Sequence, residues 1–119
     1  MKRAPQAVDD PVRPPQSWQR LTDRYPDIAA AYDVFSDVCR QSGPLDEATV
    51  AIVKLAVSVG RGASRTVHSH AKKALRNGAD PQALRQVALV ALPTIGLPAA
   101  LDALKWIDES IDERSRSQD

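Results

Sequence analysis

The sequence predicts an all-α protein, a single-domain bundle of about six helices. From Trp18 onward apolar residues recur every three or four positions, the helical period, and no stretch alternates in polarity as a strand does. Residues typical of helix starts and ends divide this pattern into short segments. With 119 residues, 43% of them apolar, the chain can bury one modest core but not two.

The first two helices are short and sit close together in the sequence. Ser17 is a suitable N-cap for a helix that ends near Arg24, and Pro26 suits the first position of the next helix, which we expect to end at Gly43. One face of this second helix carries Ile28, Tyr32, Phe35 and Cys39. Cys39 is therefore expected in the core, on an apolar face, as an inert thiol.

The third helix follows the N-cap Asp46 and ends in the Gly60-Arg61-Gly62 run. It is apolar nearly all round, so we expect it to be the central and most buried helix. Lys54 interrupts this apolar run. That lysine either extends from the helix edge to solvent or supplies a cation beside the helix that follows.

Three further helices complete the bundle. Ser64 is expected to cap the fourth helix, which ends at Asn77-Gly78. The Asp80-Pro81 pair opens the fifth, which Pro93 and Gly96 should interrupt, and the sixth begins at about Pro98. Trp18 and Trp106 are interpreted as packing or subunit-contact residues.

The ends of the chain lack this pattern. Residues 1–16 contain four prolines among charged and small residues and are expected to form a disordered tail. The helical domain should span residues 17–114, and the charged segment 115–119 should fray.

Composition excludes several function classes. Sixteen basic and fifteen acidic residues nearly balance, so neither nucleic acid nor a membrane surface is an expected partner. No window approaches the roughly 18 apolar residues of a membrane span or resembles a leader, which predicts a cytoplasmic protein. The single cysteine excludes a CxxC pair, and without a phosphate loop or a zinc pattern we expect no cofactor and no metal.

Two histidines lie on the fourth helix. On a helical wheel Val67, Ala71 and Ala74 form an apolar stripe, and His68 and His70 fall on its two flanks, about 200° apart. Two rings so placed cannot share one metal ion within a regular helix. Each ring either packs at the core boundary, bonded to a neighbour, or acts as a general acid or base, which suits an imidazole pKa near neutrality.

Polar residues around this helix could hold a substrate. Arg61 and Arg65 could bind a carboxylate, Ser64 with the N–H groups of the helix start could bind an oxyanion, and Lys54 could add a second cation. The alternative is that both arginines are simply solvated.

The order of several short motifs is similar to one known family. Leu55-Ala56-Val57-Ser58, His70 eight residues before Gly78, the Asp80-Pro81 restart and the run Gly96-Leu97-Pro98-Ala99-Ala100 follow one another over roughly residues 45–111. In this respect the chain resembles the carboxymuconolactone decarboxylase and alkylhydroperoxidase D-like family. The resemblance implies an alkylhydroperoxidase D-like helical fold and a homotrimer or homohexamer, and it favours His70 over His68 as the catalytic residue.

The chain departs from the redox-active members of that family. Their helix with the histidine opens with a CxxC pair, and the preceding helix carries a glutamate. Here the cysteine positions fall on Ala63 and Thr66, and the glutamate position falls on Ala51. Peroxide reduction needs an attacking thiolate and a resolving thiol, so an alkylhydroperoxidase-type antioxidant activity is disfavoured.

Two functions therefore compete. The first is a non-redox enzyme, related to the decarboxylase branch, in which His70 transfers a proton on a small carboxylated or lactone metabolite. The second is a non-catalytic oligomeric scaffold that kept the fold after losing the redox centre.

The missing cysteine pair predicts that the protein has no thiol-dependent peroxidase activity. Any activity found should be unchanged in Cys39→Ser, because a lone thiol cannot complete the two-thiol cycle. Peroxide consumption by the two proteins, followed with a thiol reductant present, checks this. Turnover that vanishes in Cys39→Ser would contradict it.

Overall fold

A computed structural model describes residues 16–118 of the chain, and six helices form nearly all of it. They are α2 (Gln16–Arg24), α3 (Pro26–Arg40), α4 (Glu47–Arg61), α5 (Ser64–Arg76), α6 (Pro81–Ile95) and α7 (Leu97–Gln118). Residues 16–118 contain no strand. The predicted all-α fold of about six helices is confirmed.

Local signals set several helix boundaries. The Asp46 carboxylate accepts a hydrogen bond from the Thr49 backbone N–H at 2.9 Å, and Asp80 accepts one from the Gln82 N–H at 2.9 Å. Both aspartates are the N-caps expected for α4 and α6. At the end of α4, Gly62 adopts φ 71°, a left-handed conformation that favours glycine.

Other boundaries differ from the sequence prediction. α2 begins at Gln16, so Ser17 lies inside the helix, and the N-cap of α5 is Ala63 in extended conformation, so Ser64 is the first helical residue. Residue type alone does not reveal a shift of one position. Gly96 ends α6 as expected, but Pro93 does not interrupt it, and the helix continues to Ile95. The proline lies close to the helix end, where one missing backbone hydrogen bond does not stop the helix.

The end of α3 also comes earlier than Gly43. The helix stops at Arg40, and the Ser42 hydroxyl then donates to the Cys39 carbonyl at 2.8 Å. This local bond competes with continued helix, as serine side chains commonly do.

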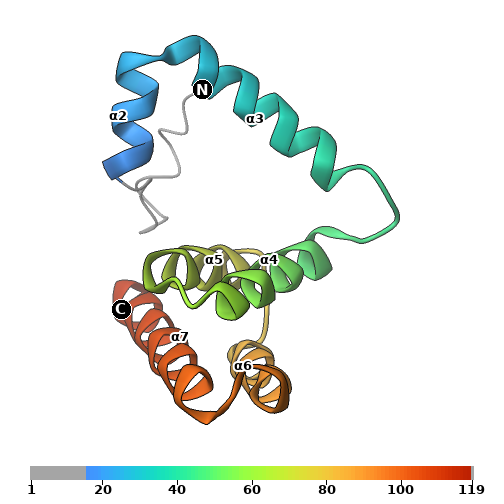
Figure 1. Cartoon of the computed structure of the whole chain (residues 1–119), viewed down its shortest axis with the longest axis vertical. Coiled ribbons are helices and arrows are strands. Elements are labelled where there is room, and N and C mark those ends of the chain that lie inside the picture. Colours follow the sequence, from blue (N-terminus) through green and yellow to red (C-terminus); the bar gives the residue numbers. More distant parts are fainter. Residues whose placement is uncertain (1–15, 119) are drawn as a thin grey trace.

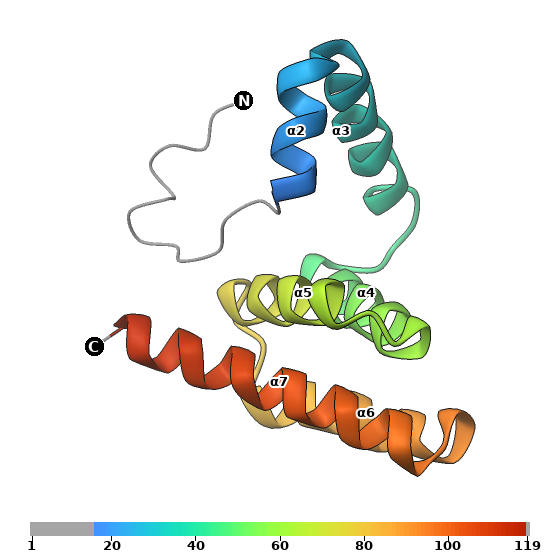
Figure 2. The same cartoon turned by 60° about the vertical axis from the view of Figure 1, so that its left-hand side comes forward.

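Four helices, α4 to α7, form the bundle that contains the main core. Figures 1 and 2 show α4 and α5 side by side in one layer, with α6 and α7 in the layer beneath. α5 packs on both α4 and α7, and α6 closes the other side by packing on the same two helices. The fully buried side chains of this core include Leu55, Val67, Ala71, Ala74, Leu84, Ala88 and Ile107.

The remaining two helices, α2 and α3, form a hairpin that stands off from this bundle (Figures 1 and 2). They pack mainly on each other, and the Trp18 and Tyr32 rings meet with their centroids 5.6 Å apart. Ala29 is the buried residue of α3. Cys39 is exposed, so its expected place in the core is wrong.

The expectation that α4 is the most buried helix is also wrong for the single chain. Ala51, Leu55, Ser58 and Val59 are buried on one side, but Val53 and Val57 are 46% and 60% exposed on the other. The reason is that α5 and α6 make the main contacts with α4, while α2 and α3 pack mainly on each other. The apolar sequence of a helix does not by itself show which of its faces another element will cover.

The predicted tail, residues 1–16, lies outside the described residues except for Gln16. α7 continues through 115–118, so the fraying expected of that segment stays a prediction. Between residues 16 and 118, no helix has the length and apolarity that crossing a membrane requires.

Candidate functional site

A stripe of small side chains on α5 sets the orientation of both histidines. Val67, Ala71 and Ala74 have no exposed surface, and they turn this face of α5 into the core between α4 and α7. His68 and His70 therefore lie on opposite flanks of α5, as the helical wheel predicts. His68 faces α7, and His70 lies on the side of Lys54 of α4.

His68 is held at both ring nitrogens. Nδ1 lies 3.1 Å from the Ser64 carbonyl oxygen, and Nε2 lies 2.9 Å from Oε1 of Glu109 on α7. Both partners are acceptors, so each ring nitrogen that carries a hydrogen can donate to the oxygen that faces it. This arrangement matches a boundary residue that joins two helices.

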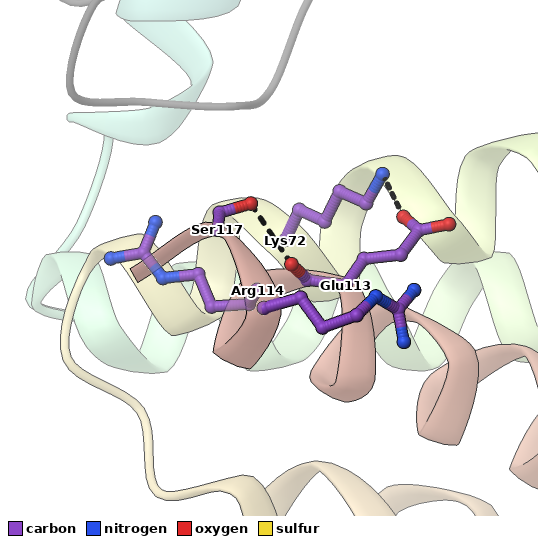
Figure 3. Close-up of a pocket in the computed structure, with 5 residues that line it drawn as sticks. Lys72, Glu113, Arg114 and Ser117 are labelled. Carbon is purple, nitrogen blue, oxygen red and sulfur yellow. Dashed lines mark hydrogen bonds and ion pairs between the residues drawn. The ribbon is translucent and has the colours of Figure 1, made fainter. Parts of the chain in front are cut away.

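Glu109, the α7 partner of His68, could not be predicted from the sequence. It lies 41 residues from His68, and no local spacing connects the two. One helical turn further along both helices, Lys72 and Glu113 form an ion pair, drawn in Figure 3. Together the two pairs fix the register of α5 against α7.

His70 has a different environment. Its side chain is about half-buried, and no residue between 16 and 118 forms a hydrogen bond with its ring. Burial is the main cause that lowers its pKa from 6.5 to about 4, and the Lys73 and Lys54 ammonium groups lower it further. At neutral pH the ring is therefore uncharged and has cations on two sides.

The proposed substrate-binding residues separate into two groups. Lys54 lies close enough to His70 to affect its protonation, and no acidic group among residues 16–118 pairs with it. Ser64 lies at the start of α5, where its carbonyl holds His68. Arg61 and Arg65 are exposed at the corner between α4 and α5, and in the described part of the chain neither forms an ion pair.

Three positions carry redox residues in the redox-active proteins that this chain resembles. In this chain none of the three carries a thiol or a carboxylate. Ala51 is buried in α4, Ala63 precedes α5, and the Thr66 hydroxyl donates to the Ala63 carbonyl at 3.1 Å. Cys39 lies on α3, whose main contact is α2 rather than α5. Within residues 16–118, no three His, Cys, Asp or Glu side chains gather as metal ligands would.

Two concave regions lie away from His70. A polar cleft of about 430 Å³ lies beside the end of α7 and is lined by Lys72, Glu113, Arg114, Arg116 and Ser117. Figure 3 labels Lys72, Glu113, Arg114 and Ser117 in it. A second, apolar groove of about 510 Å³ runs between α4 and α6 and includes Ile52, Ala56, Val87 and Val90. Neither is lined by His70 or Lys54. The candidate site is therefore defined by His70 and by the effect of the Lys54 and Lys73 ammonium groups on its pKa.

One protein family matches most of this chain. The model of the family described as "Carboxymuconolactone decarboxylase family" matches residues 26–109, which is more than half of the chain. The match extends from α3 into α7. The curated proteins and the solved structures gave no match.

The lowered pKa of His70 predicts a pH-dependent stability. Between pH 6.5 and 4 the unfolded chain binds the His70 proton more readily than the folded chain. The contribution of His70 to the free energy of unfolding is therefore fully present above pH 6.5, and it is lost as the pH falls toward 4. From pH 6.5 to 5 the loss should be on the order of 2 kcal/mol.

Urea unfolding of wild type, His70→Gln and His68→Gln at these two pH values measures this loss. His70→Gln should show a smaller difference between the two pH values than wild type, while His68→Gln keeps the contribution of His70. The same difference in wild type and His70→Gln would contradict the assigned environment.

Proposed function

Because the chain belongs to the carboxymuconolactone decarboxylase family, we propose that it is a non-redox enzyme in which His70 transfers a proton on a small carboxylated or lactone metabolite. The observation that carries the proposal is the position of one half-buried imidazole beside cations from two helices. Because residues 63 and 66 carry no thiol, proton transfer is favoured over a thiol-based redox reaction.

Decarboxylation is the lyase reaction that best suits these groups. The bond between the substrate carbon and its carboxylate breaks, CO₂ leaves, and the bonding electron pair stays on the substrate as an enolate. A proton from His70 then completes the product, and solvent reprotonates the ring. The overall change replaces a carboxylate by a hydrogen and consumes one proton, with no change in the redox state of the protein.

The substrate itself supplies the charge that this step needs. A carboxylate bound near Lys54 opposes the electrostatic effect of the lysines on the ring, and it raises the pKa of His70 from about 4 toward neutrality. The ring then gains a proton as the substrate binds, and it is poised as the acid. In a lactone isomerisation the neutral ring first removes a proton from one carbon of the substrate. It then delivers that proton to a different carbon.

Positioning of the substrate falls to the groups around the start of α5. Lys54 provides a half-buried cationic contact, and Arg61, Arg65 and Ser64 at the α4–α5 corner are available for the second polar end of the molecule. His68, already bonded to Ser64 and Glu109, supports the position of this corner instead of contacting substrate.

The non-catalytic scaffold remains the second candidate, and one observation favours it. Large apolar side chains are exposed on α3, α4 and α6, which is typical of surfaces that meet other protein. An assembly and an enzyme are compatible, so ligand binding and turnover decide between the two functions.

A thermal-shift screen with small carboxylates and lactones should identify a ligand that raises the melting temperature, because binding to the folded state alone stabilises it. With that ligand as substrate, His70→Gln should lower kcat by about 10²–10⁴-fold. Lys54→Met should weaken carboxylate binding by about 10–100-fold, the loss of one charged hydrogen bond.

Two variants serve as controls. His68→Gln, which removes only a support of the corner, should lower kcat far less than His70→Gln. Lys105→Met, on the exposed part of α7, should leave carboxylate binding unchanged. Full turnover in a folded His70→Gln would exclude the catalytic role of His70. A wild-type protein that binds and converts none of these compounds would favour the scaffold.

A further inference from the structure

We propose that the polar cleft beside the end of α7 binds the phosphate group of a small phosphorylated molecule. The cleft has a volume of about 430 Å³ and is lined by Lys72 of α5 and by Glu113, Arg114, Arg116 and Ser117 of α7. Its size is typical of sites for small molecules. Because neither His70 nor Lys54 lines it, this site is separate from the proposed site of proton transfer.

The lining of the cleft carries more positive than negative charge. Lys72, Arg114 and Arg116 are cations, and Glu113 is the one carboxylate among the lining residues that the structure describes. Lys72 Nζ lies 2.5 Å from Glu113 Oε1, so these two charges pair with each other. Within residues 16–118, neither arginine forms an ion pair. Both guanidinium groups are therefore available to a ligand that carries negative charge.

Helical spacing places these groups around one face of α7. Each residue turns by about 100°, so Glu113 and Ser117 lie one turn apart on the same face, and Arg114 and Arg116 lie on its two flanks. α5 packs on α7 and brings Lys72 to this face, where it meets Glu113 (Figure 3). The Ser117 hydroxyl donates to the Glu113 carbonyl at 2.9 Å, and by rotation it can donate to a ligand oxygen instead.

Phosphate is the anion that suits these donors best. Each guanidinium is a planar fork of N–H groups that fits two oxygen atoms of one phosphate, and a phosphate monoester carries nearly two negative charges at neutral pH. The Lys72 side chain is only 24% exposed and Arg114 is partly buried, so solvent and salt screen this part of the cleft incompletely.

The negative end of the α7 dipole explains only part of this charge. It favours a cation in the last turn of the helix, where Arg116 lies. Lys72 belongs to another helix, and Arg114 precedes Arg116 on the opposite flank. Three cations around one cleft therefore indicate a ligand as well as a capped helix end.

Glu113 responds to the positive potential of the cleft. The hydrogen bond from Lys72 is the main cause that lowers the pKa of Glu113, and the charges of Lys72, His68 and Arg116 lower it further, while burial opposes them. The carboxylate therefore stays ionised and offsets part of the positive charge. Its removal should strengthen the binding of an anion.

Calorimetric titration of the full chain at constant ionic strength tests the site, with inorganic phosphate, pyrophosphate and adenosine monophosphate as ligands. Wild type should bind at least one of them, and Arg114→Gln and Arg116→Gln should each weaken binding by about tenfold, the loss of one charged hydrogen bond. Arg20→Gln is the matched control, because exposed Arg20 on α2 does not line the cleft. Absence of binding by wild type, or equal weakening in all three variants, would overturn the proposal.

The sign of the effect at Glu113 provides a second test. Glu113→Gln should tighten phosphate binding by about fivefold, because it removes a nearby negative charge and releases Lys72. Asp102→Asn, an exposed position on α7 that does not line the cleft, removes the same charge and should leave binding unchanged. Weaker binding by a Glu113→Gln protein with the melting temperature of wild type would overturn the proposal.

A single-stranded RNA oligonucleotide distinguishes a small-molecule site from a surface for nucleic acid. The nearly balanced charge of the chain favours the small molecule. Wild type should therefore bind the RNA more weakly than the best of the small phosphate compounds. Tighter binding of the RNA would overturn the assignment of the cleft to a small phosphorylated molecule.

Discussion

Close packing of one narrow stripe on α5 determines where the polar groups of this protein lie. Val67, Ala71 and Ala74 are fully buried, and because two of them are alanines, α4 and α7 can both pack closely against the same helix. Rotation of α5 by even a small angle would expose this stripe. The rotation is therefore fixed, and the two histidines must leave the helix on opposite sides.

That fixed rotation gives the two histidines different chemistry. His68 meets oxygen atoms at both nitrogens, from Ser64 and from Glu109, and so joins α5 to α7. Burial and two nearby ammonium groups lower the pKa of His70 and keep its ring neutral. A neutral imidazole that recovers basicity when an anion binds is suited to proton transfer on a carboxylate, and it needs no thiol. The proposed acid–base function therefore rests on His70 alone and not on a thiol.

Much of this fold could be predicted from the sequence, because helix caps and apolar spacing are local properties. Asp46 and Asp80 cap their helices as expected, and the opposite flanks of His68 and His70 follow from the helical period. What could not be predicted depends on contacts between distant segments. Nothing near His68 indicates Glu109, and nothing in α3 indicates that its own bundle leaves Cys39 and the apolar face exposed.

The account depends most on the protonation of His70, and ring proton resonances followed by NMR from pH 3.5 to 8 measure it directly. With His70→Gln used to assign the signal, the His70 ring of the free protein should titrate near pH 4, and a small carboxylate ligand should move the midpoint toward neutrality. A midpoint near 6.5 in the free protein, unchanged by the ligand, would contradict the proposed site.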